Sequence, residues 1–252
     1  PVSPFPNLHT IGPNIKFYIQ NNVRALFMQA TGNKGEFGHL RAYLITKLMW
    51  NPNADPNLII NDFLHGYYGE AATLILNYID KMREALLNDN FRLNIFGDPR
   101  DAINNYLAPD KMIEYNSLFD EAEKLVIDNK EKFTRVREAR LPLLIAEVQI
   151  AGQIPVGQKG SFYTTNDNGN VIPKSKMKNK VEKFVASAKK AGIQRIGERA
   201  ITIDDYAYNF ERIFSKMEQM DKAISFKKKV IPISVPTFGK ENLIRLTDGI
   251  FG

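Results

Sequence analysis

The sequence predicts a mainly α-helical chain with one β/α unit at its start and a small β-hairpin near residues 161–172. Apolar residues recur at spacings of three and four along most of residues 53–228, which is typical of amphipathic helices. One short apolar run, Val23–Met28, has the length and flanks of a buried strand. The segment Asn166-Asp167-Asn168-Gly169 is a strong turn signal between two short stretches that can pair as a hairpin.

The first 52 residues follow the order helix, strand, helix. Prolines restrict the backbone over residues 1–13, so we expect a looped entry, and Gly12-Pro13-Asn14 opens a short helix that reaches about Gln20. The predicted strand, Val23–Met28, comes next. A second helix is expected from Glu36 to about Trp50, because its apolar residues form one broad stripe. This order of elements is typical of an α/β unit.

Beyond residue 53, helices follow one another without strands between them. Periodicity predicts four helices before the hairpin and two after it, over about 55–66, 70–87, 110–128, 130–151, 175–191 and 204–222. Pro142 should kink the fourth of these helices or restart it. The tail, 229–252, has alternating apolar residues and two prolines, so we expect an extended segment there.

The composition excludes several classes of protein and of site. Hydrophobic residues make up 44% of the chain and charged residues 25%, which is typical of a globular protein and not of a disordered one. No apolar run reaches the roughly 18 residues of a membrane span, and the chain has no cysteine for a disulfide, a thiolate zinc site or a nucleophile. The three histidines, His9, His39 and His65, lack the HExxH spacing of a zinc site. We therefore predict no metal and no cofactor.

The net charge of +6 comes from the end of the chain. Residues 153–252 hold eighteen basic and ten acidic residues, and many of the basic ones are lysines in Lys174–Lys190 and at 227–229. Nucleic-acid sites usually add aromatic or arginine side chains to such a patch. We therefore expect a solvated helix surface and no nucleic-acid partner, and we keep a nucleic-acid site as the third alternative.

Residues 4–80 carry several separate sequence blocks in a fixed order. They cover residues 4–8, 12–15, 22–27, 35–44, 47–52 and 62–72, the last reading Asp-Phe-Leu-His-Gly-Tyr-Tyr-Gly-Glu-Ala-Ala. In order and spacing they resemble a bacterial family of uncharacterised, glycoside-hydrolase-like barrel proteins related to α-glucuronidases. The resemblance implies a (β/α)8 barrel, of which residues 1–52 would form the C-terminal edge and 53–228 the helical domain that follows it.

A second resemblance lies at the other end of the chain. Residues 241–249, Glu-Asn-Leu-Ile-Arg-Leu-Thr-Asp-Gly, are similar to the opening of discoidin-type carbohydrate-binding β-sandwiches. The segment 229–252 would then be a linker to a following module. Together the two resemblances imply that the chain is a fragment, the middle section of a larger polysaccharide-degrading protein that is periplasmic or extracellular.

Candidate binding residues come from the predicted strand end and the loops beside it. The proteins that the chain resembles carry Glu-Gln-Gly at this strand end, where this sequence has Met28-Gln29-Ala30, so we predict no catalytic residue. The amide of Gln29 could bind sugar hydroxyls or could tie the loop. Glu36 could reach a barrel mouth or could be a first-turn carboxylate that the helix dipole favours. His9 and Asn7, in the proline-rich loop, are weaker candidates for substrate binding.

Three aromatic side chains could stack on a sugar, namely Tyr67, Tyr68 and Trp50. Tyr67 and Tyr68 lie at a predicted corner between two helices, where buried packing is the commoner role of tyrosine. Trp50 ends an apolar helix, and we expect it to anchor the core.

These features define two hypotheses for function. In the first, the chain is the C-terminal part of a glycoside-hydrolase-like protein that acts on polysaccharide or oligosaccharide, and it is not catalytic by itself. Whether the parent protein is an active enzyme is left open. In the alternative, the chain is a non-catalytic helical module that serves as a scaffold, forms a homodimer or binds carbohydrate.

Overall fold

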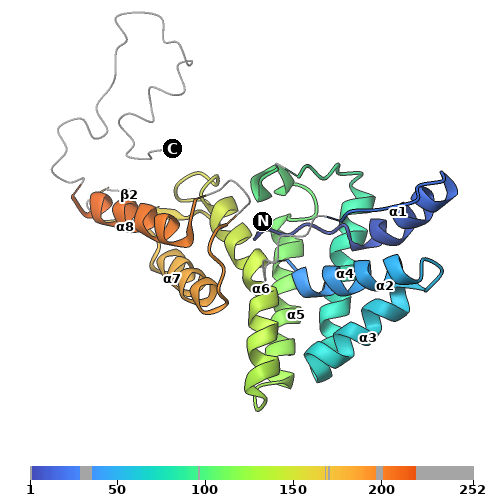
Figure 1. The fold of residues 1–252 in the computed structure, drawn as a ribbon. Coiled ribbons are helices and arrows are strands. Elements are labelled where there is room, and N and C mark those ends of the chain that lie inside the picture. The colour runs from blue at the N-terminus through green and yellow to red at the C-terminus, as the bar shows by residue number, and fades with distance from the viewer. Residues whose placement is uncertain are drawn as a thin grey trace, which may run out of the picture.

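The computed structural model describes residues 2–28, 36–95, 97–167, 169, 171–196 and 201–219 (Figure 1). Residues 213–219 are described by their backbone alone. These residues form eight α-helices, two short 3-10 helices and one antiparallel pair of strands. The bounds are α1 Leu8–Gln20, α2 Gly38–Trp50, α3 Pro56–Tyr68, η1 Gly69–Ala71, α4 Ala72–Asn88, η2 Pro99–Ala102, α5 Pro109–Leu125, α6 Lys130–Ala151, β1 Tyr163–Thr165, β2 Val171–Pro173, α7 Ser175–Lys190 and α8 Ile203–Gln219.

The mainly helical class is confirmed, and the helices predicted from residue 53 onward correspond to α3–α8. Local signals fix two of their starts. The Asp55 side chain accepts a hydrogen bond from the Asn57 amide at 2.8 Å, with Pro56 in the first turn of α3. The Asn129 side chain accepts one from the Lys132 amide at 3.0 Å at the start of α6. None of the described helices is both long and apolar enough to cross a bilayer.

Helix α6 separates two hydrophobic cores. Its Leu143, Ala146 and Ile150 pack with buried residues of α1–α5. Its Leu141, Ile145 and Val148 pack with α7, α8 and the hairpin. In Figure 1, α6 accordingly lies between α1–α5 on one side and α7 and α8 on the other. One helix therefore connects the two halves of the described structure.

Helix α6 runs through Pro142 without interruption, so a restart of the helix there is wrong. Proline removes one hydrogen bond from a helix interior and normally disturbs it. Here Pro142 is buried and α6 packs against α5 on one side and α7 on the other. Tertiary packing on both sides holds the helix together across the missing bond.

The predicted hairpin is confirmed. Strands β1 and β2 pair antiparallel with Thr164 opposite Ile172, and Gly169 in the connection has a φ of 78°, in the left-handed region that glycine accepts. Phe162, just before β1, is 2% exposed and packs into the second core. The hairpin thus covers the end of α6 with a large aromatic side chain.

The prediction of a strand at Val23–Met28 is wrong, because these residues form no regular secondary structure. Val23 is 40% exposed and Phe27 is 89% exposed. A strand is stable only when neighbouring strands satisfy its backbone groups, and among the described residues no strand pairs with this segment. Apolar content alone therefore predicted a buried strand where this structure has exposed chain. The described residues show no barrel.

Two further expectations for this region are wrong. Trp50 was expected to anchor the core, but it is 91% exposed at the end of α2. Helix α1 begins at Leu8, so Pro13 lies within it and not at its start. Leu8, Ile11 and Ile15 give α1 an apolar face that packs into the first core, and this burial decides where the helix begins. The tail 229–252 and its 241–249 motif lie outside the described residues.

Candidate functional site

The structure brings three of the four predicted binding residues together around an arginine. Asn7 and Glu36 contact Arg41 of α2, and His9 lines the same small cavity as Glu36 and Arg41. We call these four residues the N-terminal cluster. Gln29, the fourth predicted residue, lies outside the described residues. The sequence did not single out Arg41, although it stands five residues after Glu36 in the expected helix.

Both carboxylate oxygens of Glu36 are occupied within the protein. Oε1 accepts a hydrogen bond from the Phe5 amide at 2.9 Å, and Oε2 accepts one from Nη2 of Arg41 at 2.5 Å. The same Nη2 donates to the Phe5 carbonyl oxygen at 2.6 Å, and Nη1 donates to Oδ1 of Asn7. Glu36 is only 7% exposed. This buried ion pair ties the N-terminal loop to the start of α2.

The backbone before α2 is arranged for this contact. Glu36 and Phe37 have φ angles of 43° and 55°, in the left-handed region that non-glycine residues seldom adopt. Helix α2 begins only at Gly38, so Glu36 lies ahead of the helix and not in its first turn. The carboxylate is therefore positioned by the turn and by Arg41, and the helix dipole is not what fixes its place.

His9 lines a small cavity next to this ion pair. Phe37, Tyr78 and Arg83 line it too, and its volume is about 40 Å³. That volume is far below the roughly 300–1,000 Å³ of sites that hold drug-sized molecules, so we do not expect a sugar to bind there. Burial, and next the positive charge of Arg83, lower the pKa of His9, while a contact with the Pro6 carbonyl partly opposes this.

The lowered pKa of His9 predicts a pH dependence of stability. The unfolded chain takes up the proton as the pH falls below about 6.5, the ordinary pKa of histidine, whereas folded His9 resists protonation. The folded state therefore keeps the full contribution of His9 above that pH and loses it progressively below. Between pH 7.5 and 5.5, we expect the urea midpoint of the wild type to fall more than that of His9→Gln. An equal or larger fall in His9→Gln would contradict this assignment.

A second polar site lies in the middle of the fold, and sequence reasoning missed it. We call it the α5–α7 groove; it has a volume of about 340 Å³. Helix α6 contacts both α5 and α7 and forms its floor. Its lining residues are Asn116, Asp120 and Glu123 from α5, Arg137, Arg140, Leu141, Leu144 and Glu147 from α6, and Lys180, Lys183 and Ser187 from α7.

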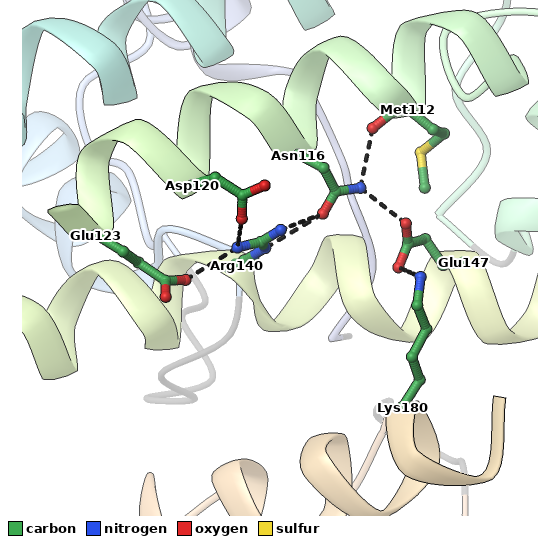
Figure 2. Close-up of polar contacts among 7 residues, drawn as sticks. All are labelled: Met112, Asn116, Asp120, Glu123, Arg140, Glu147 and Lys180. Carbon is green, nitrogen blue, oxygen red and sulfur yellow. Dashed lines mark hydrogen bonds and ion pairs between the residues drawn. The ribbon is translucent and has the colours of Figure 1, made fainter. Parts of the chain in front are cut away.

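Arg140 organises the α5 side of the groove, as Figure 2 shows. Its Nη1 contacts a carboxylate oxygen of Asp120 at 2.6 Å and one of Glu123 at 3.1 Å. Its Nη2 and Nε donate to the Asn116 side-chain oxygen at 2.6 and 3.2 Å. A single guanidinium on the floor therefore orients three side chains of the wall.

The polar contacts continue from there to α7. Nδ2 of Asn116 donates to the Met112 carbonyl oxygen at 2.9 Å and to Oε1 of Glu147 at 2.8 Å. The other oxygen of Glu147 is paired with Nζ of Lys180. The side chains of Glu147 and Lys180 are 18% and 23% exposed, so this pair is partly shielded from water. One chain of contacts thus crosses all three helices (Figure 2).

A sequence signal for the groove existed, but it was incomplete. Asn116, Asp120 and Glu123 follow one another at spacings of four and three, so they share one face of α5. Arg137, Arg140 and Glu147 share one face of α6 in the same way. Nothing local says that these two faces and the lysines of α7 point at one another. That fact comes from the packing of the helices.

The aromatic corner is a packing feature. Tyr68 is 4% exposed. The Tyr67 ring stacks on Phe63 with 4.9 Å between ring centroids, and the Arg135 guanidinium lies 4.1 Å from its centre. Tyr67 is thus held between two neighbours and is not an open platform for a sugar, which agrees with the expected packing role.

Comparison with known proteins gives one match. Residues 1–80 match the family described as "Domain of unknown function (DUF4838)". This stretch holds the N-terminal cluster and helices α1–α3, and it coincides with the sequence blocks at 4–80. No curated protein and no solved structure matches the chain. The groove, on α5–α7, lies outside the matched region.

Proposed function

We propose that this chain is a non-catalytic, mainly helical part of a glycoside-hydrolase-like protein that acts on polysaccharide. The observation that carries the non-catalytic part of the proposal is that both oxygens of the Glu36 carboxylate are hydrogen-bonded within the protein. Glycoside hydrolysis needs two carboxyl groups across the scissile bond, one of them able to donate a proton. Glu36 is the carboxylate of the N-terminal cluster, and its two oxygens already accept hydrogen bonds from Phe5 and Arg41.

The barrel edge is part of the same proposal. The blocks at residues 4–80 and the family match over 1–80 support it. The exposed run Val23–Met28 would become a strand if neighbouring strands paired with it, and Phe27 would then leave the solvent. The periplasmic or extracellular location of the parent protein rests on resemblance and belongs to this proposal too.

A glycosidase assay of the chain tests the proposal. Aryl glycosides and uronic-acid oligosaccharides would be incubated with the wild type and with Glu36→Gln. We expect no hydrolysis above the buffer rate in either sample, because both oxygens of the Glu36 carboxylate already accept hydrogen bonds within the protein. Far-UV circular dichroism would confirm that Glu36→Gln is folded. Clear turnover by the wild type that a folded Glu36→Gln lacks would overturn the proposal.

Carbohydrate binding without catalysis is the second candidate function, and the α5–α7 groove is the observation that favours it. Its volume of about 340 Å³ lies within the range of sites that hold small molecules, roughly 300–1,000 Å³. Amide, carboxylate, hydroxyl and cationic groups surround it and can bind sugar hydroxyls. The homodimer stays a prediction.

A further inference from the structure

We propose that the α5–α7 groove binds an anionic saccharide, with its hydroxyl groups against α5 and its sulfate or carboxylate group against Lys183 and Arg137. The inference rests on the proposed role in polysaccharide metabolism and names a ligand class and a site for it. Neither the sequence blocks nor the family match reaches these helices.

The groove can hold such a ligand, whereas the cavity beside His9 cannot. Its volume of about 340 Å³ falls within the roughly 300–1,000 Å³ of small-molecule sites, whereas the cavity beside His9 has about 40 Å³. Its floor and both walls come from helices that pack on one another, and the polar contacts of Arg140 and Asn116 fix the wall before any ligand arrives. Such preorganisation lowers the entropic cost of binding.

The α5 wall offers acceptors for hydroxyl groups. The Asp120 side chain is 59% exposed, and its contact in the groove is the bond to Arg140 at 2.6 Å. A carboxylate can accept about four hydrogen bonds, so Asp120, which lines the groove, keeps acceptor capacity beyond its bond to Arg140. Arg140 thus positions the Asp120 carboxylate and leaves it able to accept further hydrogen bonds. Hydroxyl donors of a sugar fit this wall better than an anion does.

The other side of the groove has surplus positive charge. The described lining contains four cations, Arg137, Arg140, Lys180 and Lys183, and three carboxylates, Asp120, Glu123 and Glu147. Arg140 and Lys180 already pair with the three carboxylates. Among the described residues, Lys183 and Arg137 have no carboxylate partner, although the Arg137 guanidinium lies 5.7 Å from the Phe133 ring. An anionic group on the ligand would pair with these two cations.

The chemistry of the lining disfavours a neutral sugar. Binding sites for neutral sugars gain from aromatic rings that cover the apolar face of the sugar, and no described lining residue is aromatic. Leu141 and Leu144 are the apolar residues of the lining. The affinity of the groove for a ligand must therefore come from hydrogen bonds and from charge. An anionic ligand can use both, because it can pair with Lys183.

The alternative is that the charged residues of the groove only hold the helices together. A change at Lys183 distinguishes this structural role from ligand binding. The contacts that join α5, α6 and α7 use Asn116, Arg140, Glu147 and Lys180 (Figure 2). Lys183 is exposed and takes no part in them. Changing it should leave the fold intact and should alter only the affinity for a ligand.

Titration calorimetry on the full chain tests the inference with four probes. They are a galacturonic acid tetrasaccharide, a sulfated galactose tetrasaccharide, the neutral galactose tetrasaccharide and inorganic sulfate. We expect at least one acidic tetrasaccharide to bind and the neutral one not to bind. Lys183→Glu should weaken that binding about tenfold or more, since a charge-assisted contact becomes repulsive. Asp120→Asn should weaken it less, and higher salt should weaken it in the wild type.

Lys176→Glu is the matched control, because Lys176 is an exposed lysine of the same helix outside the groove. It should bind the acidic probe as the wild type does. An equal loss in Lys176→Glu and Lys183→Glu would indicate general polyanion binding, nucleic acid included, and would overturn the inference. So would equal binding of the neutral tetrasaccharide, sulfate binding as tight as that of the tetrasaccharide, or no binding of any probe. None of these binding results changes the outcome of the turnover assay, so failure of this inference and failure of the proposed function can be told apart.

Discussion

Replacing Phe119 with alanine is expected to lower the free energy of unfolding by about 3–5 kcal/mol, the usual cost of removing a large aromatic side chain from a core. Phe119 is fully buried on α5. Its ring centre lies 4.8 Å from that of Tyr78 on α4, and the Arg140 guanidinium of α6 lies 5.9 Å away. Three helices meet at this side chain, so none of them can fill the space alone. Urea unfolding followed by circular dichroism measures the loss.

Phe27→Ala is the matched control for Phe119→Ala. It removes the same atoms from a side chain that is 89% exposed, so we expect a change within about 0.5 kcal/mol. The pair also tests the correction for Val23–Met28. A loss for Phe27→Ala as large as that for Phe119→Ala would mean that this run is buried in solution, as a strand would be.

Replacing Arg41 with alanine is expected to destabilise the chain by about 3 kcal/mol. The change leaves the Glu36 carboxylate, which is 7% exposed, without its positive partner, and removing one member of a buried ion pair typically costs about 3–5 kcal/mol. We take the lower end because the Arg41 side chain is 21% exposed. The Phe5 carbonyl and Asn7 lose a hydrogen-bond donor as well. The urea midpoint and its slope would be measured at pH 7.

A double-mutant cycle separates the ion pair from general damage. Because the two changes act on one contact, Glu36→Gln combined with Arg41→Ala should cost clearly less than the sum of the single changes. Arg92→Ala is the control, since Arg92 is an exposed arginine, and it should cost no more than about 0.5 kcal/mol. Strict additivity in the cycle would show that Glu36 and Arg41 do not depend on each other.

The helices that the sequence predicted correctly are those whose local signals and periodicity agree. In α4, for example, Ile75, Tyr78 and Met82 recur at spacings of three and four, and all three are buried. The hairpin was predictable for the same reason, because Gly169 marks its turn. The prediction failed at Val23–Met28 and at Trp50, where an apolar residue type implied burial that no neighbouring element provides.

For the candidate binding residues, the structure gives their positions, and their role in binding stays a prediction. Asn7, His9 and Glu36 were predicted from their places in the loops, and the structure places them together. The sequence did not predict Arg41 as the partner of Asn7 and Glu36, because such contacts depend on how the chain folds back on itself. The groove was not predicted at all, since its residues come from three helices.

By itself, the sequence determined the helical class, the hairpin and most helix bounds, because these depend on spacings of a few residues along one chain. Only the tertiary structure decided that Glu36 is held by Arg41, that Phe27 and Trp50 stay exposed, and that Lys183 and Asp120 line one groove. The physical reason is that burial and charge pairing depend on which faces pack together. Helices α5, α6 and α7 acquire a common polar site only when the two cores form on either side of α6.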